Sequence, residues 1–129
     1  MMRNKISQVL AIAAAILLTQ TAMAQSRMDK LMTSTTPEER AELQTQNMKE
    51  SLSLSEEQYQ RVHELNLKYA RRMQSIYQTD GGKLQRLKSM KATSEEKDRE
   101  LKRILDSRQY KLYKDQKEEM KENARKQRR

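Results

Sequence analysis

His63 is the only histidine of the chain, and the chain has no cysteine. A zinc-type site needs several nitrogen, sulfur or carboxylate ligands at matched spacing, so one histidine does not make a site. The carboxylate pairs Glu56–Glu57 and Glu95–Glu96 fall in expected first turns of helices, where negative charge complements the helix dipole. Acid–base catalysis also requires a pocket, which thin helical layers do not offer. We therefore predict no enzyme activity, no metal and no cofactor.

Basic side chains are better candidates for function. Lys and Arg outnumber Asp and Glu by 27 to 18, and the excess lies in the C-terminal half, from Gly81 onward. Such a positive field attracts acidic partners and speeds their encounter. Two stretches, KYARRM and KLQRLKSMK, interleave cations with apolar residues, and the candidate binding residues are Lys68, Arg71, Arg72, Lys83, Leu84, Arg86, Leu87, Lys88, Met90 and Lys91. The plainer interpretations are a solvated helix face for the first stretch and leucines in a dimer core for the second.

Two similar hexapeptides, LSEEQY and LDSRQY, predict where two helices start. In each, the second residue can cap the helix, and the glutamine three residues later can accept a hydrogen bond from the backbone N–H of the cap. The flanking leucine and tyrosine have the spacing of a hydrophobic staple. These helix-start motifs comprise Leu54, Ser55, Gln58, Tyr59, Leu105, Asp106, Gln109 and Tyr110.

The other local signals predict an all-α fold. TPEER supplies a cap at Thr36, a proline at the first helical position and a capping-box glutamate, so a first helix should cover residues 37–51. A second helix should cover residues 55–78, because apolar residues recur there at helical spacing. They are Tyr59, Val62, Leu65, Tyr69, Ala70, Met73, Ile76 and Tyr77. No stretch alternates with the two-residue period of a strand.

The C-terminal half should form two more helices. One should start near Lys83, after the helix-ending DGG, and TSEE at residues 93–96 is a further capping box that allows a pause or kink there. The last should start at Asp106, with a narrow stripe of Tyr110, Tyr113, Met120 and Ala124. We therefore expect about four helices in a thin layer, which leaves apolar surface exposed unless two copies pair.

The N-terminal residues have the pattern of a secretory signal peptide. Arg3 and Lys5 precede a short apolar run, ISQVLAIAAAILL, and AMA provides a cleavage site before Gln25. An uncleaved membrane anchor is the alternative, but the run is short for a bilayer. We therefore expect a signal peptide over residues 1–24 and a periplasmic protein. A flexible arm over 25–35, a helical domain over 36–120 and a fraying basic tail over 121–129 should follow.

LSLSEEQYQRV and ILDSRQYKLY resemble the paired LTxxQ motifs of the Spy/CpxP family of periplasmic proteins, in the form found in Bacteroidetes-type bacteria. Ser55 stands where the family motif has threonine, and Asp106 and Arg108 make the second copy less regular. The resemblance implies an ATP-independent chaperone shaped as a thin, curved, cradle-like antiparallel homodimer. Its basic face, with apolar patches, would hold unfolded or partly folded envelope proteins, so the candidate residues above become client-binding candidates.

Three other roles deserve comparison with chaperoning. An envelope-stress regulator would bind one folded sensor protein and ignore unrelated unfolded ones. A basic amphipathic helix could also bind an anionic membrane surface, although we do not favour this. Nucleic-acid binding is not expected, because the protein should be exported and its tyrosines lie in helical stripes rather than on a stacking platform.

Overall fold

The computed structural model describes residues 27–79, 81–127 and 129, and the regular elements in these ranges are all α-helices. The predicted all-α fold class is therefore confirmed for this part of the chain. The predicted signal peptide, residues 1–24, lies outside it. Residues 27–34, expected to belong to a flexible arm, are helical and fall in a compact unit separate from residues 35–127. Within the described ranges, no helix is both long and apolar enough to cross a bilayer.

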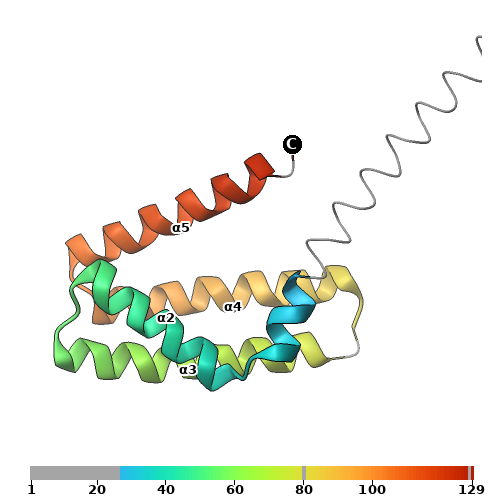
Figure 1. The fold of residues 1–129 in the computed structure, drawn as a ribbon, viewed down its shortest axis with the longest axis horizontal. Coiled ribbons are helices and arrows are strands. Elements are labelled where there is room, and N and C mark those ends of the chain that lie inside the picture. The colour runs from blue at the N-terminus through green and yellow to red at the C-terminus, as the bar shows by residue number, and fades with distance from the viewer. Residues whose placement is uncertain (1–26, 80, 128) are drawn as a thin grey trace, which may run out of the picture. The chain divides into compact units, whose positions relative to one another are not determined.

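The larger unit contains four helices that follow one another with short connections (Figure 1): α2 (Pro37–Leu52), α3 (Glu56–Gln78), α4 (Lys83–Ile104) and α5 (Ser107–Gln127). Each begins within one residue of its predicted start. α3 and α4 run antiparallel and pack side by side, and α2 packs against α3. α5 turns back at the end of α4 and diverges from it toward the C-terminus.

The start of α2 shows how local signals fix these boundaries. The Thr36 side chain accepts a hydrogen bond from the Glu39 backbone N–H (3.1 Å), and the Glu39 carboxylate accepts one from the Thr36 N–H (2.8 Å). Pro37 occupies the first helical position, where a missing N–H costs nothing. The helix ends where Ser53 adopts the left-handed conformation (φ 53°), which turns the chain toward α3.

The core lies between α2, α3 and α4 and is closed by the beginning of α5. Its buried residues are Met48, Leu52, Leu54, Val62, Leu65, Tyr69, Leu101, Leu105 and Tyr113. Of the predicted stripe of α3, only Val62, Leu65 and Tyr69 are buried. Its other members, Tyr59, Ala70, Met73, Ile76 and Tyr77, are half-exposed. Two fully buried polar residues, Thr45 and Asn66, join α2 to α3 through a 3.0 Å hydrogen bond.

Three sequence predictions about the C-terminal half were wrong. α4 runs through residues 92–96 without a break, and Thr93 is buried inside the helix instead of capping a new one. A cap is needed only where backbone N–H groups lack a preceding turn, and here the preceding turn of α4 supplies their carbonyl partners. α5 remains helical to Gln127 rather than fraying after Met120, and Met120, expected in the stripe, is 65% exposed.

Candidate functional site

Both helix-start motifs form the predicted capping boxes. The Ser55 hydroxyl accepts a hydrogen bond from the Gln58 N–H (3.2 Å), and the Gln58 side-chain oxygen accepts one from the Ser55 N–H (3.0 Å). The Asp106 carboxylate and Gln109 repeat this arrangement at 2.8 and 3.0 Å. The two hexapeptides therefore start α3 and α5 by the same local geometry.

The structure also joins the two motifs to each other, which the sequence did not predict. The Gln58 side-chain amide donates to the Gln109 oxygen (2.7 Å), and the Gln109 amide donates to the Gln58 oxygen (3.0 Å). Each amide donates a further 3.2 Å hydrogen bond to a helix-terminal carbonyl, Gln58 to Ile104 and Gln109 to Leu52. We call this the glutamine joint. It ties the starts of α3 and α5 to the ends of α4 and α2.

The apolar residues of the motifs pack in two different ways. Leu54 and Leu105 are buried in the core, and Tyr110 packs partly buried against it. Tyr59 contacts α2 instead, because its hydroxyl accepts a hydrogen bond from Gln46 (3.0 Å) and the Lys49 ammonium lies 4.9 Å from the centre of its ring. The motifs therefore serve the architecture of the fold, and none of their residues is poised for chemistry.

The three basic candidates on α3 are already paired within the chain. Each forms an ion pair with a carboxylate of α2 or α4, at nitrogen–oxygen distances of 2.7 to 3.0 Å: Lys68–Glu100, Arg71–Glu38 and Arg72–Glu96. Solvent-exposed pairs of this kind contribute only about 0–1 kcal/mol each to stability. Their positive charge is nevertheless balanced locally, which makes them weaker candidates for capturing a partner than the sequence suggested.

The basic candidates at the start of α4 behave differently. Leu84 and Leu87 are 67% and 55% exposed, while Arg86 and Met90 are half-exposed. Among the described residues, none of the cations of this segment forms an ion pair with a carboxylate. The first turn of α4 has no acidic residue and no side-chain cap. We call the exposed residues Lys83, Leu84, Leu87, Lys88 and Lys91 the α4 stripe.

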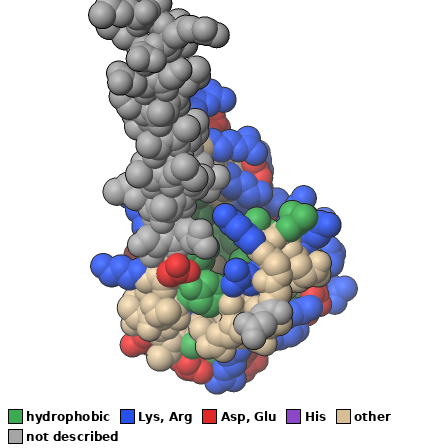
Figure 2. All heavy atoms as spheres, turned by 90° about the vertical axis from the view of Figure 1, so that its right-hand side faces the viewer, with side chains coloured by type: hydrophobic (Ala, Val, Ile, Leu, Met, Phe, Trp, Pro, Cys, Tyr) green, Lys and Arg blue, Asp and Glu red, His purple; other side chains and the backbone are tan. Residues whose placement is uncertain are grey.

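The α4 stripe lies near the turn that connects α3 and α4. Figure 2 views the protein from that end and shows many Lys and Arg side chains on this face, with smaller groups of hydrophobic side chains between them. Positive side chains near a helix N-terminus are repelled by the positive end of the helix dipole. An anionic partner would offset this repulsion. Among the described residues, the α4 stripe therefore combines exposed leucines with lysines that form no ion pair.

A buried carboxylate, Asp98, anchors α5 to α4 and was missed in the sequence. It is 7% exposed and accepts a hydrogen bond from the Tyr113 hydroxyl (2.7 Å). The Lys117 ammonium donates to both of its oxygens (3.0 and 2.8 Å) and to the Ser94 hydroxyl (3.0 Å). We call Ser94, Asp98, Tyr113 and Lys117 the Asp98 cluster. The four-residue spacing of Tyr113 and Lys117, which places both on one helix face, was the available signal.

Acid should weaken the Asp98 cluster. Burial alone raises the pKa of Asp98, but the hydrogen bonds from Lys117 and Tyr113 outweigh it and lower the pKa below its ordinary 3.8. Near that pH the unfolded chain therefore binds more protons than the folded protein. The stabilisation is present above about pH 3.8 and is lost as pH falls through the pKa of Asp98 in the folded protein. We expect the free energy of unfolding to fall more steeply below pH 3.8 for the wild type than for Asp98→Asn, as measured by urea unfolding. Equal slopes for the two proteins would contradict this account of the cluster.

A neighbouring lysine, Lys97, is partly buried and contacts α2. The Lys97 ammonium donates to the Gln44 side-chain oxygen on α2 (3.0 Å). Burial, together with the nearby charge of Lys117, lowers the pKa of Lys97 to about 8, against a smaller opposing effect of Asp98. This single hydrogen bond links α4 to α2 and offers no second chemical group with which the amine could act.

His63 lies on α3 and is half-exposed. Its ring stacks on Tyr59 at a centroid distance of 6.4 Å, and its Nδ1 is buried without a hydrogen-bond partner in the described part of the chain. Across the described ranges, no three His, Asp or Glu side chains come together in a way that could hold a metal ion.

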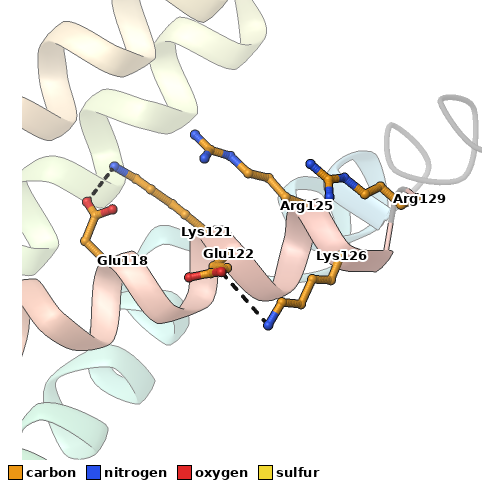
Figure 3. Close-up of a pocket in the computed structure, with 6 residues that line it drawn as sticks. All are labelled: Glu118, Lys121, Glu122, Arg125, Lys126 and Arg129. Carbon is orange, nitrogen blue, oxygen red and sulfur yellow. Dashed lines mark hydrogen bonds and ion pairs between the residues drawn. The ribbon is translucent and has the colours of Figure 1, made fainter.

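The end of α5 carries an open hollow of about 290 Å³ (Figure 3). Ion pairs link Lys121 to Glu118 (3.5 Å) and Lys126 to Glu122 (4.0 Å), and the lining residues are Glu118, Lys121, Glu122, Arg125, Lys126 and Arg129. All of them come from the end of one helix, so the hollow does not exclude water. A reaction site needs groups that converge from several elements, which this hollow lacks.

Comparison with known proteins adds a family but no function. Residues 22–113 match the model of the family described as a domain of unknown function (DUF4890). No curated protein and no solved structure matches the chain.

Proposed function

We propose that this chain, which belongs to the family described as a domain of unknown function (DUF4890), is an ATP-independent periplasmic chaperone. It binds unfolded or partly folded envelope proteins and suppresses their aggregation. The observation that carries the proposal is the α4 stripe, in which exposed Leu84 and Leu87 lie among lysines that have no carboxylate partner in the described chain.

The α4 stripe suits weak and general binding. Its positive charge attracts acidic chains over long range and raises the rate of encounter. Its two leucines then contact apolar segments of the client, with an affinity low enough for the client to leave and fold. Met90, half-exposed beside them, has a flexible side chain that adapts to irregular apolar surfaces. Such contacts do not depend on one particular client sequence.

Three further points complete the proposal. The periplasmic location rests on the signal-peptide pattern of residues 1–24, with cleavage before Gln25. The thin, cradle-like antiparallel homodimer rests on the resemblance to the Spy/CpxP family, and exposed Leu84 and Leu87 could equally lie at its interface. Without a glycine-rich phosphate loop in the sequence, no use of ATP is expected.

The α4 stripe can be tested by substitution. We expect Leu84→Ser combined with Leu87→Ser to weaken binding of a labelled, permanently unfolded acidic protein by roughly tenfold, the equivalent of about 1.4 kcal/mol of lost apolar contact. Fluorescence anisotropy would measure the affinity. Leu43→Ser is the matched control, because Leu43 on α2 is 65% exposed and lies outside the stripe. Equal affinities for the double variant, the control and the wild type would rule out the stripe as the client site.

Binding to an anionic membrane surface is the second candidate, because the α4 stripe is itself basic and apolar. Two exposed leucines provide little apolar area for insertion, so we rank this role below chaperoning. The two roles separate experimentally: co-flotation with anionic vesicles that salt abolishes would favour the membrane. A regulator of envelope stress would instead bind one folded partner and none of several unrelated unfolded proteins.

A further inference from the structure

α5 is attached to the rest of its unit by its first half only. Gln109 and Tyr113 are its buried residues, whereas residues 118–127 are exposed throughout. α2 and α3 differ from it, since each buries residues along several successive turns. A helix with this little buried surface is expected to separate from the core at a lower free energy than the others.

The contacts that hold α5 are mainly polar. Gln109 belongs to the glutamine joint, and Tyr113 and Lys117 bind Asp98 on α4. Water can replace such contacts when they break, so each contributes a net stabilisation much smaller than its strength in isolation. The apolar surface that α5 buries belongs chiefly to the Tyr113 ring, and contact with water does not replace the free energy that this burial contributes.

An apolar surface lies under the start of α5. Asp98 and Leu101 lie near one face of α4 by helical spacing, Leu105 follows directly after the helix, and Tyr113 packs in the same cluster as both leucines. Leu101 is fully buried and Leu105 nearly so. Leu105 has an extended backbone (φ −85°, ψ 148°), and only Leu105 and Asp106 separate α4 from α5. A change of backbone angles at these two residues would move α5 as a unit.

We propose that α5 is a latch that opens at Leu105–Asp106, and that the uncovered surface around Leu101 and Leu105 is a second, concealed site for apolar segments of unfolded clients. The client part rests on the proposed function. The Asp98 cluster and the hydrogen bonds of Gln109 in the glutamine joint hold the latch closed. Opening adds apolar area to what the α4 stripe offers, and closing covers it again, so that the free protein does not expose a surface prone to aggregation.

Hydrogen exchange of the full chain tests the latch itself. In the wild type, amides of residues 110–117 should exchange faster than those of residues 62–69 in α3. Asp98→Asn should speed exchange in α5 by roughly ten- to a hundredfold while leaving α3 unchanged, because a hydrogen bond to a charged group is lost. Tyr113→Phe, which keeps the ring, serves if Asp98→Asn does not fold. Identical exchange rates for the two segments in wild type and variant would overturn the proposal.

A covalent lock tests whether opening exposes a binding surface. The chain has no cysteine, so Ser94→Cys with Lys117→Cys can be joined by a short bis-maleimide. The same double variant with each cysteine capped by N-ethylmaleimide, which cannot bridge the two helices, is the matched control. The locked protein should bind less of the uncharged apolar dye Nile red and suppress client aggregation less than the control. Equal dye binding would refute the concealed surface. If the wild type suppresses no aggregation, the proposed function fails. Hydrogen exchange and dye binding still test whether α5 opens and uncovers an apolar surface.

Discussion

Replacing Gln109 with alanine is expected to lower the free energy of unfolding by about 2–4 kcal/mol, more than the roughly 1 kcal/mol typical of a lost helix cap. The side chain is 7% exposed and takes part in the capping box, in two hydrogen bonds with Gln58 and in one with the Leu52 carbonyl. Truncation leaves several of these partners without a hydrogen bond in a place that water reaches poorly. The measurement is urea unfolding followed by circular dichroism.

A double-mutant cycle separates the glutamine joint from two independent caps. Gln58→Ala and Gln109→Ala share the two hydrogen bonds that link them. Their combined effect should therefore be smaller than the sum of the single effects, by about 1–2 kcal/mol. Gln85→Ala, at an exposed position in the first turn of α4, is the control and should change stability little. Additivity within about 0.5 kcal/mol would show that the caps act separately.

Leu101→Ala should cost about 3–5 kcal/mol, in the upper part of the range for a buried leucine. Leu101 is completely buried, and its cluster includes residues from all four helices of the unit. Truncation removes apolar burial and leaves a cavity that helices packed on several sides cannot easily close. A protein this small has little stability to spare, so partial unfolding at room temperature is expected.

The matched control for Leu101 is Leu84, which lies on the same helix but is 67% exposed. Leu84→Ala should change the free energy of unfolding by less than about 0.5 kcal/mol. Similar losses for the two variants would mean that α4 is not packed as the structure shows. If Leu101→Ala destabilised α5 alone, the packing of the other three helices would not depend on Leu101.

The helix starts were predictable because their signals are local. The capping boxes at Thr36 and Ser55, and the one at Asp106, each occupy a few consecutive residues, and all three helices begin where these residues predict. The same rule failed at Thr93, where the pattern lies within a continuous helix. A capping pattern shows that a helix can start at a position, and only the packing of the neighbouring turns decides whether it does.

The contacts between elements were not predictable from one sequence. Gln58 and Gln109 are 51 residues apart, and nothing in either hexapeptide indicates that their amides meet. The binding candidates show the same limit. KYARRM and KLQRLKSMK look alike as charge patterns, yet the cations of the first meet carboxylates of other helices and those of the second do not, within the described chain.

The proposed function is tested most directly by aggregation suppression in the absence of ATP. The chain from Gln25 to Arg129 would be present while two unrelated, chemically unfolded proteins, one acidic and one basic, are diluted into buffer. Light scattering would follow their aggregation. A general chaperone that captures clients by charge should suppress both, the acidic one more strongly, and salt should weaken the effect. Undiminished aggregation of both proteins would contradict the chaperone role and favour a dedicated regulatory or membrane-surface function.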